Sequence, residues 1–94
     1  MEKMEHIRGK IVDGEQTLVD PVDGYLAYHD HKGRKTFYGY FEMDTERLKV
    51  LNHETCYRLV LSDGRKGNIY TEIVPSNIAG KSVAEFHVSG GMKK

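Results

Sequence analysis

Residues 56–74 read CYRLVLSDGRKGNIYTEIV, and this stretch decides the fold. On both sides of Asp63-Gly64, apolar, aromatic or β-branched residues recur at every second position, which is the pattern of a strand with one buried face. Asp and Gly both tolerate the positive φ angles that tight hairpin turns require. The stretch therefore predicts two antiparallel strands, Cys56–Ser62 and Gly67–Val74, joined by this turn.

The same pattern extends over the rest of the chain. Alternation is clear over Glu5–Val12 and Thr36–Met43, and shorter strands are expected at Gln16–Val19, Tyr25–His29 and Ala84–Ser89. Turn signals fall between these segments at Asp13-Gly14, Asp23-Gly24 and Lys32-Gly33. We therefore expect an all-β fold, a small single-domain antiparallel barrel or half-barrel of about six or seven short strands, because open sheet edges invite aggregation.

The chain length of 94 residues suffices for one domain. We expect a single β domain over residues 5–89, with flexible tails at residues 1–4 and 90–94. The segment Asp44–Leu51 fits either a short helix with Asp44 at its N-cap or a strand. We favour strand or irregular structure there, because isolated helices of about two turns are marginal.

Composition limits the classes of function. Lys plus Arg and Asp plus Glu number 14 each, so the net charge is zero and the chain lacks the large positive field of most nucleic-acid binders. No apolar run approaches the ~20 residues of a transmembrane helix, and Met1–His6 shows no apolar segment typical of a secretion signal. The lone Cys56 excludes an internal disulfide. We therefore expect a cytoplasmic protein with no membrane association.

Histidines are the candidate ligands of a metal ion. His29 and His31 share one face if their segment is extended, and His53 lies three residues before Cys56. Structural zinc sites, however, use paired ligands such as Cys-x-x-Cys or His-x(3–5)-His, which this chain lacks. We expect solvated histidines at a polar hairpin end, with no metal and no cofactor.

Candidate catalytic groups are equally unspecific. Cys56 would need His53 or His87 as a base to act as a nucleophile, but alternation groups it with Val60, where a free cysteine is typically a small buried hydrophobe. The aspartates that precede Gly or Pro suit turns rather than acid–base pairs: Asp13, Asp20, Asp23 and Asp63. We assign no catalytic residue and favour a non-catalytic role, while enzyme activity stays an open question.

Alternation over Thr36–Met43 predicts which side chains face the solvent. Successive side chains of a strand point to opposite faces of the sheet. We therefore expect Tyr38 and Tyr40 to face outward. The apolar side chains of the opposite face should enter the core: Phe37, Phe41 and Met43.

Cations of nearby turns and strands complete a candidate binding patch of Tyr38, Tyr40, Arg34, Lys35 and Arg58. Tyrosine is enriched in protein interfaces, whereas rings flanked by cations also hold single-stranded nucleic acid on small barrels. Because the net charge is zero, we favour a non-catalytic interaction module that acts through protein contacts or self-association. Single-stranded nucleic-acid binding through the same patch is the alternative.

Overall fold

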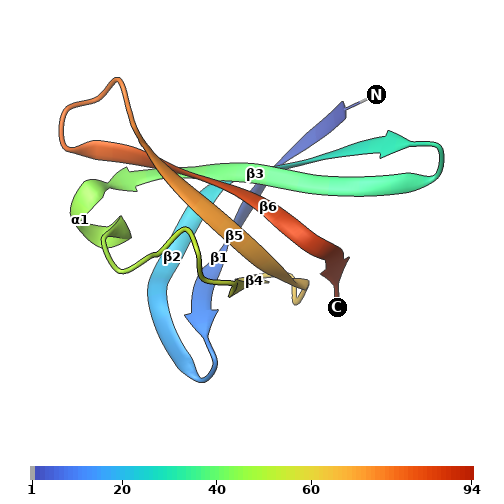
Figure 1. Cartoon of the computed structure of the whole chain (residues 1–94), viewed down its shortest axis with the longest axis horizontal. Coiled ribbons are helices and arrows are strands. Elements are labelled where there is room, and N and C mark those ends of the chain that lie inside the picture. Colours follow the sequence, from blue (N-terminus) through green and yellow to red (C-terminus); the bar gives the residue numbers. More distant parts are fainter. Residues whose placement is uncertain (1) are drawn as a thin grey trace.

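Antiparallel strands close into one barrel in the computed structural model, which describes residues 2–94 (Figure 1). The order around the barrel is β1-β2-β3-β6-β5-β4, and β1 pairs with β4 to close the ring. The all-β antiparallel barrel expected from the sequence is confirmed. Within these residues the elements are β1 (Glu2–Asp13), β2 (Gln16–His31), β3 (Arg34–Asp44), α1 (Thr45–Leu48), β4 (Tyr57–Leu61), β5 (Lys66–Pro75) and β6 (Lys81–Lys93).

Apolar residues at alternate strand positions fill the barrel interior. Ile11, Leu59 and Ile69 are fully buried on β1, β4 and β5. The Phe41 ring of β3 stacks on Phe86 of β6 with 4.9 Å between ring centroids. Burial of such side chains contributes about 1.5–3 kcal/mol each, which is the main force that closes so small a sheet. The side chains between them point outward and form the outer face of the barrel.

The hairpin predicted around Asp63 is confirmed. β4 and β5 pair antiparallel, with Tyr57 opposite Ile69. At the turn, the Asp63 carboxylate accepts hydrogen bonds from the Arg65 backbone N–H at 3.0 Å and from the Arg65 guanidinium at 2.9 Å. The hydrogen bond from the Arg65 backbone is the main reason that the pKa of Asp63 lies below its ordinary value. Gly64, with a φ of 97°, takes the left-handed position of this turn.

One predicted turn is wrong, because Asp23-Gly24 lies inside a strand. β2 continues through this pair, and Gly24 lies opposite Phe41 of β3. A Cβ atom on Gly24 would overlap the Tyr40 carbonyl oxygen and approach Phe41 Cδ1 to 2.8 Å. Glycine is therefore required here for the close approach of two strands. As a result, the separate strands expected at Gln16–Val19 and Tyr25–His29 form the single strand β2.

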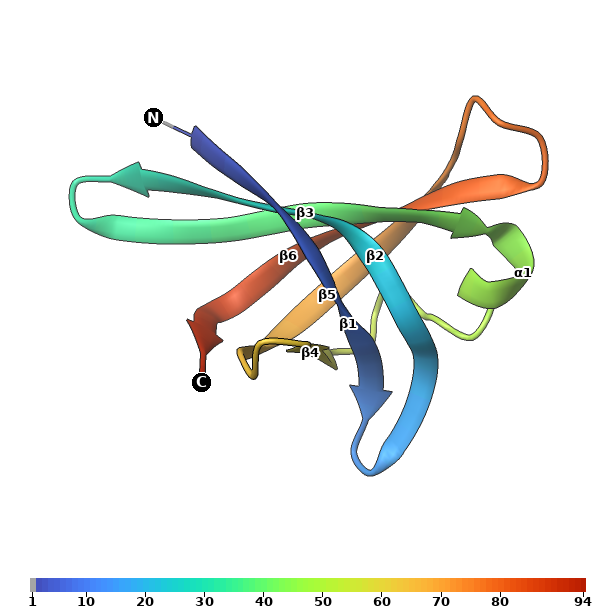
Figure 2. The same ribbon diagram turned by 180° about the vertical axis from the view of Figure 1, so that it is seen from behind.

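Long hairpins extend beyond the barrel. β1 and β2 are joined at Asp13-Gly14, and β2 and β3 at Lys32-Gly33, as predicted. In both views of the ribbon, the tip of the β2–β3 hairpin projects from one side of the barrel, while α1 lies at the opposite side (Figures 1 and 2). Residues at the hairpin tip are therefore remote from most of the barrel surface.

The strand or irregular structure favoured for Asp44–Leu51 is wrong for Thr45–Leu48, which form the helix α1, whereas Asp44 ends β3 and residues 49–51 are irregular. Leu48 is 1% exposed and belongs to the core, and the Leu51 backbone N–H donates to the Leu48 carbonyl at 3.1 Å. Packing of Leu48 supplies the stability that so short a helix lacks in isolation. Among the described residues, no helix is long and apolar enough to cross a membrane.

The tails expected at residues 1–4 and 90–94 are mostly strand. β1 begins at Glu2 and β6 runs to Lys93. Glu2 pairs with β2 and Lys93 pairs with β5, so neighbouring strands hold both ends of the chain in the sheet. Residue 1 lies outside the described part of the chain.

Candidate functional site

Burial confirms the alternation predicted along β3. Phe41 is 0% exposed and Met43 is 6% exposed, whereas Tyr40 is 37% exposed. Phe37 is partly buried and packs against the same core. Tyr38 shares the outer face with Tyr40, because the two are separated by one residue of the same strand. The outer face of β3 therefore carries the tyrosines, as expected.

Outward rings continue from β3 across the neighbouring strands. Successive rings on β1, β2 and β3 have centroids 5.5 Å and 5.6 Å apart. On the next two strands, the Tyr70 ring of β5 stacks on the His87 ring of β6 with 5.5 Å between centroids. His87 in turn lies opposite Tyr38 of β3. We call this set the aromatic face: His6, Tyr25, Tyr38, Tyr40, Tyr70 and His87.

The structure brings the predicted patch together only in part. Tyr38 and Tyr40 are neighbours on β3, and Arg34 and Lys35 lie at the tip of the β2–β3 hairpin (Figure 1). Arg58 lies on β4, and β4 and β3 are separated by two strands in either direction around the closed barrel. The three groups therefore occupy different parts of the surface.

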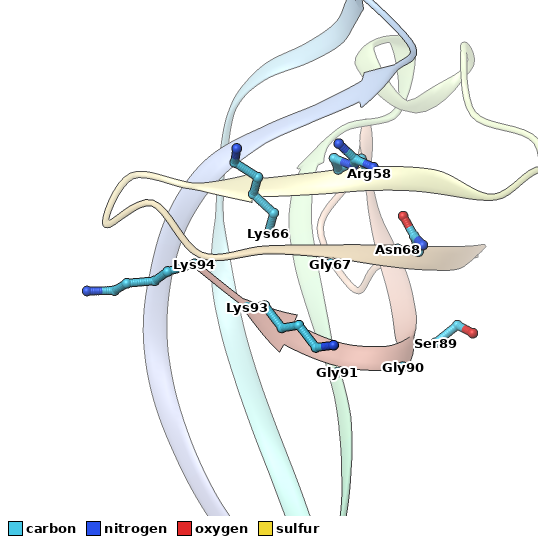
Figure 3. A pocket seen from close by; sticks show the side chains of 9 residues that line it. All are labelled: Arg58, Lys66, Gly67, Asn68, Ser89, Gly90, Gly91, Lys93 and Lys94. Carbon is cyan, nitrogen blue, oxygen red and sulfur yellow. The ribbon is translucent and has the colours of Figure 1, made fainter.

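A basic hollow lies on the outer face of β4, β5 and β6. It has a volume of about 400 Å³, and its cations are Arg58, Lys66, Lys93 and Lys94. Arg58 of β4, Asn68 of β5 and Ser89 of β6 lie in one row across the three strands (Figure 3). Small or neutral residues complete the lining: Gly67, Asn68, Ser89, Gly90 and Gly91. Among the described residues, no acidic side chain lines this basic hollow.

The basic hollow forms where β6 bulges at Gly90-Gly91. Asn68 lies opposite Ser89, but Lys66 lies opposite Lys93, so β6 uses two more residues than β5 over this interval. Gly90 and Gly91 have φ angles of 85° and 90°, in the left-handed region that favours glycine. These glycines were expected in a tail, and of the cations in the hollow only Arg58 belongs to the predicted patch. The Gly90-Gly91 pair, followed after Met92 by two lysines, is the sequence signal that could have revealed the basic hollow.

The opposite end of β5 and β6 is acidic. Glu72 lies directly opposite Glu85. Both line a second hollow of about 370 Å³, together with Tyr70, His87 and His53. Like charges that face each other across two strands destabilise a sheet. The outer face of β5 and β6 therefore runs from a basic end, across a pair of stacked rings, to an acidic end.

Known proteins offer no guide to this surface. Comparison with protein families, with curated proteins and with solved structures found no match for the chain. Function is therefore inferred from the charges, rings and hollows of the outer face.

The metal and nucleophile candidates lie apart. The rings of His29 and His31 stack at 6.2 Å on one exposed face, as alternation predicted, whereas His53 lines the hollow at the acidic end. Among the described side chains, those of residues 4–94, no group of three His, Cys, Asp or Glu residues could hold a metal ion. Cys56 is exposed, so the expected burial of this thiol is wrong. The reason is that β4 begins at Tyr57, which leaves Cys56 in the preceding loop.

Added zinc is not expected to raise the thermal midpoint of unfolding. A ligand that binds only the folded state raises the midpoint, but the stacked imidazoles of His29 and His31 lack a third ligand among the described side chains. Thermal unfolding with and without stoichiometric zinc provides the measurement. A rise of several degrees that disappears in the double variant His29→Ala, His31→Ala would show that these two residues form a metal site.

Proposed function

We propose that the protein is a small non-catalytic β-barrel interaction module that acts through protein contacts, with the aromatic face as its contact surface. The observation that carries this proposal is the row of exposed rings, of which Tyr25, Tyr40 and Tyr70 are 39%, 37% and 36% exposed. Large rings that remain exposed in a monomer supply the contact area of many interfaces.

The rings are also held in place before any partner binds. They project from paired strands, and three neighbouring pairs of rings have centroids 5.5–5.6 Å apart: His6–Tyr25, Tyr25–Tyr40 and Tyr70–His87. The His6 ring nitrogen also contacts the Asp23 carboxylate. Side chains that are already ordered lose little conformational entropy when they bind. A cytoplasmic location belongs to the same proposal, because a single exposed thiol at Cys56 suits a reducing compartment.

Single-stranded nucleic-acid binding is the second candidate, and the basic hollow is the observation that favours it. Its cations could contact phosphate groups, and the Tyr70–His87 stack beside it could receive a base. Glu72 and Glu85 lie on the far side of the same stack and would repel a strand that continued past it. Protein contact is therefore the function that the whole face supports best.

A capture experiment tests the contact function. A tagged chain is incubated with native lysate and, in a separate sample, with an untagged copy of itself. The captured proteins are quantified before and after nuclease treatment. The double variant Tyr40→Ala, Tyr70→Ala should recover about tenfold less protein than the unaltered chain, because exposed tyrosines dominate the energetics of such surfaces. Thr36→Ala, at an exposed position of β3 outside the aromatic face, is the control and should recover an unchanged amount.

Two results would contradict the contact function. Equal recovery by the tyrosine variant and the Thr36→Ala control would show that the rings do not bind a partner. Recovery that vanishes on nuclease treatment would assign the face to nucleic acid instead.

A further inference from the structure

We propose that the partner of this module is a second copy of the chain, which docks on the outer face of β5 and β6 in the antiparallel orientation. This assignment rests on the proposed function, because two rings of the aromatic face, Tyr70 and His87, lie on these strands. It is carried by the distribution of charge along these two paired strands, which cross the front of the barrel in Figure 1. When a second copy lies on this face with its strands in the reverse direction, its basic end meets the acidic end of the first copy.

The two strands carry like charges opposite each other at two levels. Lys66 lies opposite Lys93, and Glu72 lies opposite Glu85. Each arrangement is unfavourable in a single copy, because like charges across a strand pair repel. Among the side chains of residues 4–94, no ion pair relieves either of them. In a second copy, the glutamate pair can neutralise the lysine pair of the first copy, and the lysine pair can neutralise the glutamate pair.

The spacing of the two levels allows one copy to neutralise the other. Lys66 and Glu72 are separated by about 20 Å along β5, given the rise per residue of an antiparallel strand. A two-fold axis that lies in the contact plane and crosses the strands at the level of Ile69 reverses the strand direction. It places Lys66 over Glu72 of the second copy and Lys93 over Glu85 of the second copy. Because the axis is two-fold, each of these two contacts occurs twice in the dimer, once from each copy.

The shape of the face fits the same axis. Tyr70 and His87 stack at an interplanar angle of 18° and separate the two hollows. The axis sets this ring pair over Asn68 and Ser89 of the second copy, which line the basic hollow (Figure 3). A Cβ atom at Gly90 would meet nothing within 4 Å, so the hollow is open beside this residue and can receive the rings. Rings then fill the centre and ion pairs surround it, as in other protein interfaces.

A phosphate-bearing ligand is the competing occupant of the basic hollow, because cations without nearby carboxylates attract phosphate oxygens. Such a ligand would leave the acidic pair Glu72 and Glu85 without a counter-charge. A second copy neutralises the basic and the acidic pair together. The observations therefore favour the dimer.

The test exchanges the charges of one level at a time. One variant carries Lys66→Glu and Lys93→Glu, and the other carries Glu72→Lys and Glu85→Lys. We expect the unaltered chain to show a monomer–dimer equilibrium in sedimentation velocity between about 10 μM and about 1 mM, weakened by added salt. Each variant alone should have a dissociation constant about 100-fold higher or more, because like charges then face each other. Their equimolar mixture should form the dimer again.

A matched control separates this geometry from attraction between net charges. Glu15→Lys with Asp30→Lys adds the same positive charge as Glu72→Lys with Glu85→Lys, but at exposed positions of the β1–β2 turn and the β2–β3 hairpin, outside β5 and β6. Mixed with the Lys66→Glu, Lys93→Glu variant, it still places glutamates over glutamates at one level, so the two should pair weakly. Circular dichroism checks that every variant is folded. If charge reversal unfolds a variant, Lys66→Gln with Lys93→Gln should still raise the dissociation constant about tenfold.

Several outcomes would overturn the dimer. These are an unaltered chain that stays monomeric to about 1 mM, a mixture of the exchanged variants that does not pair, and a control that pairs as well as the exchanged variants. A monomer whose hollow residues shift in NMR spectra on addition of inorganic phosphate would assign the hollow to a phosphate-bearing ligand. Tyrosine-dependent capture of another protein by a monomeric chain would keep the proposed function and reject this interface, so the two failures are distinguishable.

Discussion

Phe41→Ala is expected to destabilise the protein by about 3–5 kcal/mol. Phe41 is 0% exposed, and its ring stacks on Phe86 with 4.9 Å between the centroids. Truncation removes this contact and leaves a cavity that the surrounding strands cannot fill, because β3 is hydrogen-bonded to strands on both sides. A domain of this size has only about 5–15 kcal/mol of stability. The midpoint of urea unfolding should therefore fall sharply.

Tyr40→Ala is the matched control, because Tyr40 is the adjacent residue on the same strand and is 37% exposed. Its ring pairs with Tyr25 across the strands at 5.6 Å, a contact worth about 0.5–1.5 kcal/mol. We expect a loss within that range. An equal or larger loss for Tyr40→Ala than for Phe41→Ala would mean that the outer face is not exposed in solution, and the aromatic face would then be part of the core.

Strands and their buried faces were predictable because they depend on neighbouring residues. A strand with one buried face needs apolar side chains at every second position, and this constraint is visible within a few residues. The register of β3, with Phe41 inward and Tyr40 outward, follows from it directly. The turn at Asp63-Gly64 is equally local, since Asp63 bonds to Arg65 within the turn itself.

Close packing between distant segments was not predictable from such patterns. The dipeptide Asp-Gly forms a turn at Asp63-Gly64 but continues a strand at Asp23-Gly24. The difference lies in Phe41 and the Tyr40 carbonyl, which leave no room for a side chain at Gly24. Likewise, the helix α1 depends on the burial of Leu48 in the core, which a two-turn window cannot reveal.

The candidate site was predictable only within one strand. Tyr38 and Tyr40 share a face by alternation, but the position of Arg58 depends on the order of strands around the barrel. The pairing of Lys66 with Lys93 depends further on the bulge at Gly90-Gly91. Strand order and bulges arise from long-range pairing, so the charge distribution along β5 and β6 emerges only in the folded barrel.

Gly39→Ala is expected to cost about 3 kcal/mol or more, although it adds a single methyl group. Gly39 lies on the core side of β3, opposite Leu26 of β2 and Phe86 of β6. A Cβ atom there would overlap the backbone carbonyl oxygen of Tyr25 and approach Phe86 Cζ to 2.6 Å. The carbonyl belongs to the β2–β3 ladder and the Phe86 ring stacks on Phe41. Neither group can move away without loosening the barrel.

Gly14→Ala separates this steric effect from the general cost of replacing glycine. Gly14 lies in the β1–β2 turn with a φ of +61°, and a Cβ atom there would meet nothing within 4 Å. Its replacement should cost only the strain of the left-handed conformation, about 1–2 kcal/mol. Urea unfolding of both variants at one temperature gives the comparison. If Gly39→Ala costs no more than Gly14→Ala, the carbonyl of Tyr25 and the ring of Phe86 do not press on β3. A clearly larger cost would show that closure of the barrel depends on the absence of a side chain at Gly39.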